Sequence, residues 1–363
     1  MKPIFVPRFI DSNNTNAQNL NAKQLLGLFK KNQWKSIYYN SPDRQLWDQS
    51  NIHLFKLASG RMWTLSLIKH YLSHYSAVFY PGKERHDIIA LKLRHLLKKQ
   101  GPVISTIEGI MGGKERELSL TASFKHPVHC NNVDTSRQKN FDALYQYSDH
   151  IIAISPFLEK VAKTIYKKSV TYLPLGIDKA FYFERAKKNR NIVMCVGSLN
   201  QNKNPHLFLR AAAEFPTINF IWYGDGPLLS SLKKTCVDKK LSNIEFFGKI
   251  SPDKLVDCYQ QASIFVLPSF SEGAPKVLQE AAAASLPLVS FGYYEPPSVR
   301  HNENGYLVWS DQEFFNSIDN LLCNDSQYED MCKASYELAL GWEWSEIAPQ
   351  WLNTLESIIE SSH

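Results

Sequence analysis

The sequence predicts an α/β protein made of two doubly wound domains that follow one another along the chain. The chain has 363 residues, a length that favours two domains, with a single barrel as the alternative. Its hydrophobic fraction of 44% and charged fraction of 21% are typical of a soluble globular protein. Short apolar runs alternate with helical stretches twice, and a polar, basic stretch over residues 184–190 separates the two series as a linker.

In the first half, short apolar runs bounded by polar or turn residues predict strands. Helical apolar spacing predicts two helices, and Ser155 followed by Pro156 is typical of a third helix start. The predicted strands cover residues 3–10, 36–39, 76–80, 103–107, 150–154 and 170–173, and the helices 20–29, 87–100 and 157–166.

The second half repeats the alternation with more regular spacing. Its predicted strands cover residues 192–196, 218–223, 244–247, 264–267 and 288–290, and its helices 205–214, 228–236, 252–261 and 274–284. A last helix is predicted over 342–362. We therefore expect an N-terminal domain over 1–180, a second domain over 181–340, and a C-terminal helical segment over 341–363.

The two halves carry opposite charge. Residues 1–190 hold 30 of the 41 Lys and Arg but only 14 of the 35 Asp and Glu, a net charge of +16, so residues 191–363 carry −10. The basic residues are densest over 83–99, where leucines and isoleucines interleave with them in an imperfect amphipathic helix. Such a helix is either a core helix with a solvated basic face or a surface attracted to anionic lipid or an acidic acceptor. No nucleic-acid-binding motif accompanies the charge, and no nucleic-acid partner is expected.

The cysteine pattern and the N-terminal segment bear on the compartment. The six cysteines include no C-x-x-C pair, which argues against a zinc site and a dense disulfide framework. The first apolar stretch is too short and too interrupted by proline for a signal peptide, and no run approaches the ~18 apolar residues of a membrane span. We expect a cytoplasmic protein that could lie peripherally on a membrane, with no metal and no cofactor.

A loop followed by a helix carries the strongest chemical signal. The segment Glu272-Gly273-Ala274-Pro275-Lys276-Val277-Leu278-Gln279-Glu280 comes directly after the strand predicted over 264–267. A helix start presents unpaired N–H groups and a positive dipole to a phosphate. Glu272 suits neutral sugar hydroxyls, and Glu280 lies roughly 12 Å further along, about the span from a hexose to a ribose. The alternative is a surface helix with two solvated glutamates.

A second loop follows the first strand of the second half, where open α/β sheets bind ligands. Val196-Gly197-Ser198-Leu199-Asn200-Gln201-Asn202-Lys203-Asn204 contains a lysine that could neutralise a diphosphate leaving group. With Gly224-Asp225-Gly226-Pro227 and Asn304-Gly305-Tyr306-Leu307-Val308, these motifs resemble the retaining glycosyltransferases of family 4. The resemblance runs from about 150 to 308. It implies the GT-B architecture, two Rossmann-like domains facing across a cleft with a C-terminal helix crossing back to the first.

The resemblance also implies a reaction and a set of site residues. A metal-independent enzyme would move a sugar, with retention, from a UDP- or GDP-sugar to an acceptor hydroxyl in glycan, polysaccharide or glycolipid biosynthesis. Lys203 would contact the diphosphate, Glu272 the donor sugar and Glu280 the ribose. The remaining donor-binding candidates are Ser198, Gly226, Lys249, Gly273, Ala274, Lys276 and Val277. The acceptor, a glycan or lipid-linked and anionic molecule, would bind the N-terminal domain.

The chain departs from the family pattern at three places. Ser198 replaces the usual arginine of the first loop. The usual glycine pair near the N-terminus is absent, and the segment that replaces it includes Asn14, Thr15 and Asn16, either as ligand contacts or as a turn. Glu108 stands where many relatives have histidine, with His126 and His129 as further acceptor-side or merely structural candidates. These departures keep two alternatives open, a non-catalytic sugar-nucleotide-binding protein and a GT-B epimerase or phosphorylase.

Overall fold

The computed structural model describes residues 3–7, 34–38, 52–56, 61–113, 135–183 and 190–362. Contacts divide the chain into two units. The described residues up to 113, together with 135–175 and 347–362, form the first unit, and residues 176–346 form the second. The helix predicted over 20–29 lies outside the described residues, as does the linker predicted over 184–190 apart from Arg190.

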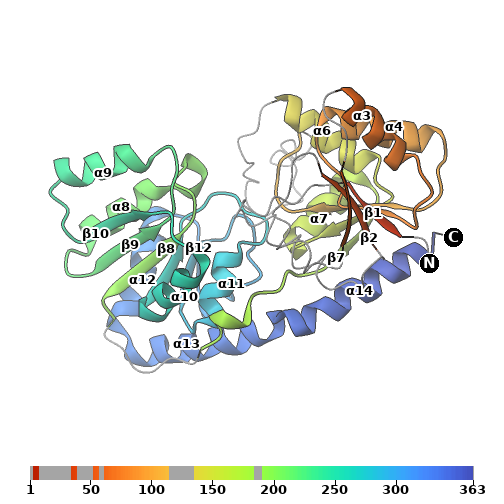
Figure 1. The fold of residues 1–363 in the computed structure, drawn as a ribbon. Helices are drawn as coiled ribbons and strands as arrows, with labels where there is room; N and C mark the ends of the chain where they lie inside the picture. The colour runs from red at the N-terminus through yellow and green to blue at the C-terminus, as the bar shows by residue number, and fades with distance from the viewer. Residues whose placement is uncertain are drawn as a thin grey trace. The chain divides into compact units, whose positions relative to one another are not determined.

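The first unit is built on a seven-stranded parallel sheet (Figure 1). Its strand order is β3-β2-β1-β4-β5-β6-β7, so the direction of winding reverses between β1 and β4. The strands are β1 (Ile4–Val6), β2 (Trp34–Tyr38), β3 (Ile52–Lys56), β4 (Val78–Phe79), β5 (Val103–Ile107), β6 (His150–Ala153) and β7 (Ser169–Tyr172). Every residue of β5 is buried, as expected for a central strand covered on both faces.

Four helices of the first unit precede the passage of the chain into the second unit. They are α3 (Arg61–Tyr71), α4 (Arg85–Leu96), α6 (Thr135–Gln146) and α7 (Pro156–Tyr166). The predicted start of α7 is confirmed, because the Ser155 side chain accepts a hydrogen bond from the Leu158 amide. Helices α3 and α4 pack against each other, and α6 packs beside α4 (Figure 1).

The second unit contains a six-stranded parallel sheet with the order β10-β9-β8-β11-β12-β13. The winding reverses between β8 and β11. The strands are β8 (Ile192–Val196), β9 (Asn219–Tyr223), β10 (Ile244–Gly248), β11 (Ile264–Leu267), β12 (Leu288–Phe291) and β13 (Gly305–Val308). Its helices are α8 (Pro205–Glu214), α9 (Leu229–Asp238), α10 (Pro252–Gln261), α11 (Lys276–Ala283), α12 (Asp311–Cys323) and α13 (Asp325–Ala339).

Two details of the sequence prediction are wrong. The helix predicted from Ala274 begins at Lys276, because Pro275 is extended and disfavours helical geometry at the residue before it. The helix predicted up to Gln100 ends at Leu96, and Lys98 just beyond it adopts a left-handed conformation. Elements β3, α3, α6, β13, α12 and α13 were not predicted from the apolar pattern.

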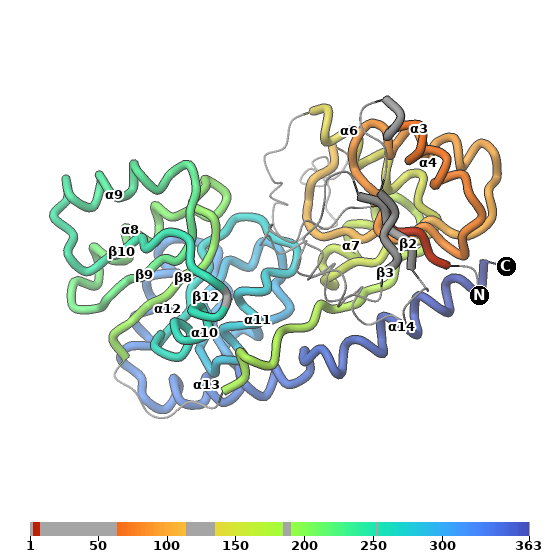
Figure 2. The backbone as a smooth tube through the Cα atoms, in the orientation of Figure 1, coloured from red at the N-terminus to blue at the C-terminus, as the bar shows by residue number. Residues whose placement is uncertain are grey.

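The C-terminal helix α14 (Trp344–Glu360) begins in the second unit and continues into the first. The smooth backbone trace shows the chain passing to the second unit after β7 and returning through α13 and α14 (Figure 2). Trp351 is fully buried, and its indole Nε1 donates to the carbonyl of Pro174 at 2.7 Å. This contact fixes the helix to the segment that leaves β7. None of the helices in the described ranges has the length and apolar character needed to cross a membrane.

Candidate functional site

The site residues of the second unit gather at the carboxyl ends of β8 and β11, where the winding of the sheet reverses. In open α/β sheets this is the place where loops diverge and leave room for a ligand. The loop after β8 carries Lys203 and the loop after β11 carries Glu272. The structure therefore brings together the two motifs that the sequence singled out.

An ion pair joins these two loops. The Lys203 ammonium Nζ lies 2.5 Å from Glu272 Oε1, and the two side chains are 16% and 15% exposed. A lysine and a glutamate held this closely with little solvent interact more strongly than a surface pair. Lys203 ends the short 3-10 helix η3 (Gln201–Lys203), whose cap Asn200 accepts a hydrogen bond from the Lys203 amide at 3.1 Å. The turn thus fixes the direction of the lysine.

Asn202 ties the two loops together through their backbones. Its carbonyl accepts from the Phe270 amide at 2.9 Å, and its side-chain amide donates to the Ser271 carbonyl at 2.7 Å. Sequence reasoning did not single out this residue, although it lies inside the 196–204 motif. Asn202 therefore positions Lys203 and Glu272 relative to each other from outside the pair.

The glycines of the third loop, after β9, let it approach the loop after β8. Gly224 has φ of +142°, and a Cβ there would overlap the carbonyl of Gly197. A Cβ at Gly226 would lie 2.5 Å from the Leu199 carbonyl oxygen and 2.6 Å from its nitrogen. The backbone of Leu199 donates to the carbonyl of Asp225 at 3.0 Å. Gly226, predicted to bind the donor, is required here for close packing of two loops.

Ser198 is exposed at the tip of the first loop. Its hydroxyl accepts a hydrogen bond from the side chain of Asn200 at 2.8 Å. A serine at this place provides no positive charge, so Lys203 is the cation that the loop after β8 supplies. With a serine in place of the expected arginine, the loop carries one positive charge fewer.

Helix α11 follows the Glu272 loop and directs its N-terminus toward the same edge of the sheet. Gly273 is buried in the loop, and the amide of Ala274 lies before the helix instead of within it. The amides of Lys276 and Val277 belong to the first turn, which contributes the positive end of the helix dipole. These two amides remain the ones suited to a phosphate.

The side chain of Lys276 points into the protein. Its Nζ lies 5.8 Å from the ring centre of Trp344, in the position of a cation–π contact. Burial lowers the pKa of Lys276, whereas the nearby carboxylates Glu280 and Asp178 raise it. The Lys276 side chain therefore interacts with residues of the interior, and its predicted donor contact stays a prediction.

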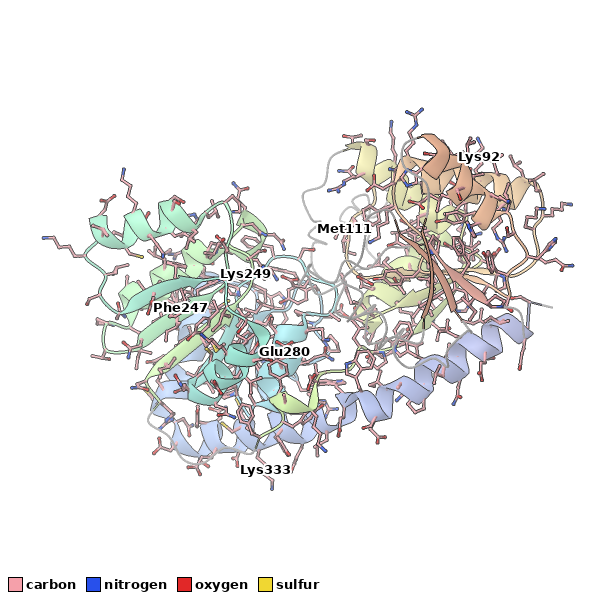
Figure 3. All side chains as sticks on the ribbon, viewed as in Figure 1. Lys92, Met111, Phe247, Lys249, Glu280 and Lys333 are labelled. Carbon is pink, nitrogen blue, oxygen red and sulfur yellow. The ribbon has the colours of Figure 1, made fainter. Side chains whose placement is uncertain are left out.

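Glu280 lies on the next turns of α11 (Figure 3) and is held by a residue that sequence reasoning missed. The fully buried Tyr259 has its hydroxyl 3.0 Å from Glu280 Oε2 and 3.3 Å from the Val277 carbonyl. Burial raises the pKa of Glu280, while the charge of Lys276 and the Tyr259 hydrogen bond lower it. A carboxylate fixed in this way suits a neutral diol such as a ribose.

Lys249 comes directly after β10 and is exposed, as is Phe247 near the end of the strand (Figure 3). The ring of Phe247 contacts that of Tyr223 at 5.4 Å between centres. Lys249 thus belongs to the same carboxyl edge of the sheet as the other loops, but among the described residues no hydrogen bond or ion pair joins it to Lys203 or Glu272. Its donor contact stays a prediction.

Glu108 lies in the first unit, one residue after β5. Its Oε1 accepts hydrogen bonds from the hydroxyl of Tyr80 and, at 3.3 Å, from that of Thr106. Within the described residues its Oε2 is buried without a hydrogen-bond partner. Tyr80, which follows β4, was not predicted. The candidates Asn14, Thr15, Asn16 and His126, with His129, lie outside the described residues.

The second-unit site can therefore bind an anion next to a polyol. Lys203 and the first turn of α11 supply positive potential, and Glu272 and Glu280 supply hydrogen-bond acceptors. Over the described ranges, no three His, Cys, Asp or Glu side chains cluster as metal ligands would. The chemistry that these groups favour is the stabilisation of negative charge on a departing phosphate.

Comparison by sequence relates the second unit to a known family. Residues 177–338 match the family model described as "Glycosyl transferases group 1". The chain is 29% identical over 191 residues to the alpha-galactosylglucosyldiacylglycerol synthase of Streptococcus pneumoniae, covering 47% of this chain and 50% of that protein. It is 26% identical over 210 residues to a Campylobacter jejuni N-acetylgalactosaminyltransferase named for an undecaprenol-linked glycan, covering 54% of this chain and 58% of that protein. The chain spans about half the length of these relatives.

Comparison by structure covers nearly the whole chain. A sucrose-phosphate synthase from Thermosynechococcus elongatus aligns with a TM-score of 0.77 at 17% identity, over 99% of this chain and 100% of that one. The Anabaena protein HepE, solved in complex with UDP-glucose, aligns with a TM-score of 0.75 at 14% identity, over 98% and 100%. These likenesses confirm the predicted GT-B fold with its two doubly wound parallel sheets.

Proposed function

Residues 177–338 belong to the group 1 glycosyl transferases, and on this premise we propose that the protein transfers a sugar from a nucleotide-diphospho-sugar to an acceptor hydroxyl. The observation that carries the proposal is the Lys203–Glu272 pair at the reversal point of the second sheet. Lys203 is a cation that can pair with the diphosphate, and Glu272 beside it can accept hydrogen bonds from sugar hydroxyls. That is what a donor with an anionic and a neutral part requires.

The reaction proceeds with retention of the anomeric configuration. The bond between the anomeric carbon and the diphosphate oxygen breaks, and the electron pair stays on the phosphate. Lys203 and the amides of Lys276 and Val277 stabilise the charge that grows there. The acceptor oxygen attacks from the face that the diphosphate leaves, and its proton passes to the departing phosphate. The protein's contribution is positioning and electrostatic stabilisation.

The donor is a UDP- or GDP-sugar. Glu272 accepts hydrogen bonds from the sugar, and Glu280, held by Tyr259, accepts them from the ribose. HepE, solved with UDP-glucose, supports a uridine nucleotide as the first choice. Because cationic and amide groups already meet the diphosphate, we propose transfer without a metal ion or other cofactor. Chelator treatment should then leave the rate unchanged.

The acceptor is a glycan or a lipid-linked and anionic molecule, and it binds the basic first unit. Glu108, which follows β5, is the residue that we assign to the acceptor hydroxyl there. The relatives named for a diacylglycerol synthase and an undecaprenol-linked glycan support a lipid-linked acceptor. The protein would act in the cytoplasm, peripherally on an anionic membrane, in glycolipid or polysaccharide synthesis.

Substitution of the central pair tests the proposal. Lys203→Ala and Glu272→Ala should each lower turnover of a UDP-sugar at least about tenfold, since each removes a group that acts on the reacting donor. The matched control is Lys333→Ala on α13, an exposed lysine paired only loosely with Glu337 at 3.8 Å. Rates like wild type in both site variants, with folded protein by circular dichroism, would overturn the assignment.

The exposed Ser198 favours one second candidate, a protein that binds sugar nucleotides without turnover. Without the arginine that the family usually has, the leaving diphosphate loses one stabilising charge. Thermal stabilisation by UDP-glucose with no nucleotide release, over a panel of hydroxyl acceptors, would identify such a binder. Release that depends on inorganic phosphate would instead identify a phosphorylase.

A further inference from the structure

An exposed apolar surface covers α3 and α4 in the first unit. Eight large apolar side chains are exposed in the described part of the chain, and five of them lie here. We call this surface the α3–α4 face and define it by Leu65, Ile89, Leu93, Leu96 and Leu97. Leu65 and Leu96 are the most exposed, at 62% and 64%. A concentration of this kind marks an interaction surface more often than scattered apolar residues do.

The face results from the periodicity of α4. The buried residues of the helix, Asp87, Ala90, Leu91 and Arg94, centre on one direction. At about 100° per residue, Ile89, Leu93 and Leu96 point to the opposite side. A surface helix normally presents polar residues there. Helix α4 therefore carries apolar side chains on its outer side as well, beside Arg85 and Lys92.

Two internal contacts hold this outer face in place. Arg94 Nη1 donates to the carbonyl of Tyr71 at 2.6 Å, and the hydroxyl of Tyr71 donates to Asp87 Oδ1 at 2.9 Å. Both contacts run between α3 and α4. Because these contacts engage the Arg94 and Asp87 side chains inside the unit, neither residue belongs to the outer face.

The charge that remains on the surface is positive. Arg85 and Lys92 flank the leucines of α4 and are exposed, as are Lys69 on α3 and Lys98 after α4. Over residues 64–100 one acidic side chain, Glu84, is exposed. Lys92 lies on the side of α4 that points away from the sheet (Figure 3). The face therefore combines an apolar centre with a cationic border.

We propose that the α3–α4 face inserts shallowly into an anionic lipid surface. Apolar side chains on one side of a surface helix enter the boundary between headgroups and acyl chains, and the lysines and arginines beside them contact lipid phosphates. Lysine is depleted from protein–protein interfaces, so Lys92 among the leucines favours lipid over a protein partner. The proposal rests on the proposed function in one respect: it names the surface through which the enzyme reaches a lipid-linked acceptor.

Sedimentation with vesicles tests the proposal. Wild type should bind vesicles of equal parts phosphatidylglycerol and phosphatidylcholine, and pure phosphatidylcholine much less. Lys92→Glu should weaken binding about thirtyfold, because it changes two units of charge worth about 1 kcal/mol each. Lys92→Arg should bind like wild type. Leu96→Ser should weaken binding about tenfold at any salt concentration, since it removes insertion and leaves the charge.

Matched controls lie in the second unit. Val237→Ser removes an exposed apolar side chain, at 76% exposure, and Lys333→Glu reverses an exposed lysine. Both should bind vesicles like wild type. The proposal would be overturned if these controls weakened vesicle binding as much as the face variants do. It would also be overturned if Leu96→Ser and Lys92→Glu bound vesicles at the wild-type level. Loss of a wild-type dimer in Leu96→Ser without any vesicle binding would assign the face to a second copy of the chain.

Thermal stabilisation by UDP-glucose separates this proposal from the proposed function. The face variants should keep the wild-type response to the nucleotide, because the donor residues lie in the second unit. A wild type that binds vesicles but no nucleotide would leave the lipid surface standing and end the donor assignment. A wild type that binds nucleotide but no vesicles would leave the donor assignment standing and end the lipid-surface proposal.

Discussion

Lys203 and Glu272 neutralise each other across two loops. A donor diphosphate would compete with Glu272 for the lysine, and the sugar hydroxyls would then occupy the carboxylate. The pair therefore holds both groups near their working positions at little cost in solvation. This arrangement explains why a single cation can serve a site in which Ser198 replaces a second one.

Under the proposed function, Tyr259 would act on the donor through Glu280. Replacing it in Tyr259→Phe removes the hydrogen bond to Glu280 Oε2 and keeps the buried ring. We expect the KM for the UDP-sugar to rise about fivefold, the cost of about 1 kcal/mol, with kcat changed little. Steady-state kinetics at varied donor concentration measure the two separately. An equal fall in kcat would show that the tyrosine acts in the transition state.

Glu280 also makes the stability of the protein depend on pH. Burial raises the pKa of Glu280, so folding with the carboxylate ionised is unfavourable relative to the unfolded chain. Stability contributed by the protonated form is lost as pH rises through the folded pKa. Glu280→Gln, which imitates the protonated form, should therefore melt higher than wild type at neutral pH, and the difference should shrink in acid.

Calorimetry from acid to neutral pH measures this difference. The same variant should bind UDP-glucose more weakly, since the ribose loses a charged acceptor. A Glu280→Gln protein that is less stable than wild type at neutral pH would contradict the argument.

At the scale of elements, the loops after β8, β9 and β11 work as one assembly. Asn202 bonds the loop after β8 to the loop after β11, and Gly226 lets the loop after β9 lie against Leu199. Three loops from neighbouring strands therefore support one ion pair. A substitution in any of these loops should therefore alter the position of Lys203, even where the substituted residue contacts no ligand.

Gly226→Ala tests this coupling. The added Cβ would lie within 2.5 Å of the Leu199 carbonyl, so the loops must separate, at a cost of about 1–3 kcal/mol. Donor affinity should fall with stability, both measured by thermal unfolding with and without UDP-glucose. Gly341→Ala is the control, because nothing lies within 4 Å of a Cβ there. Equal effects of the two substitutions would show that the loss reflects glycine replacement in general.

Sequence patterns predict elements well where the local signal is complete. The bounds of β8, β11, α8 and α10 agree residue for residue with those predicted, because each is an apolar run or a proline-opened helix closed by polar residues. Helix α11 starts two residues later than predicted because Pro275 constrains Ala274. Residues 61–71 lacked a start signal, and α3 was missed.

The site residues, too, could be predicted where the signal is local in the sequence and were missed where it depends on residues far apart in the chain. Motif spacing predicts Lys203, Glu272 and Glu280, since each stands in a recognisable loop or helix. Tyr259 and Tyr80 were missed, because their roles arise from hydrogen bonds to residues 21 and 28 positions away. The basic segment over 83–99 could be recognised, but which of its charges are internal, as Arg94 is, depends on packing against α3.

At the scale of the molecule, the two units differ in net charge and in proposed role. The chain's positive excess lies in residues 1–190 and its negative excess in 191–363. The donor residues lie in the second unit and the α3–α4 face in the first. Under the proposed function, the anionic donor would rely on a local lysine and a helix terminus within an acidic half, and the basic half would face an anionic surface.

This separation predicts that the two units respond to different perturbations. Trp351→Ala empties a fully buried site of the first unit and removes the hydrogen bond to Pro174, at a cost of about 3–5 kcal/mol. UDP-glucose at a hundredfold excess over its Kd should stabilise the second unit by about 2.7 kcal/mol. Each unit has its own sheet and core, so calorimetry should resolve two transitions. The substitution should lower one transition and the nucleotide should raise the other. A single transition that moves with both would show that the units unfold together, and that α14, which is shared between them, couples their stability.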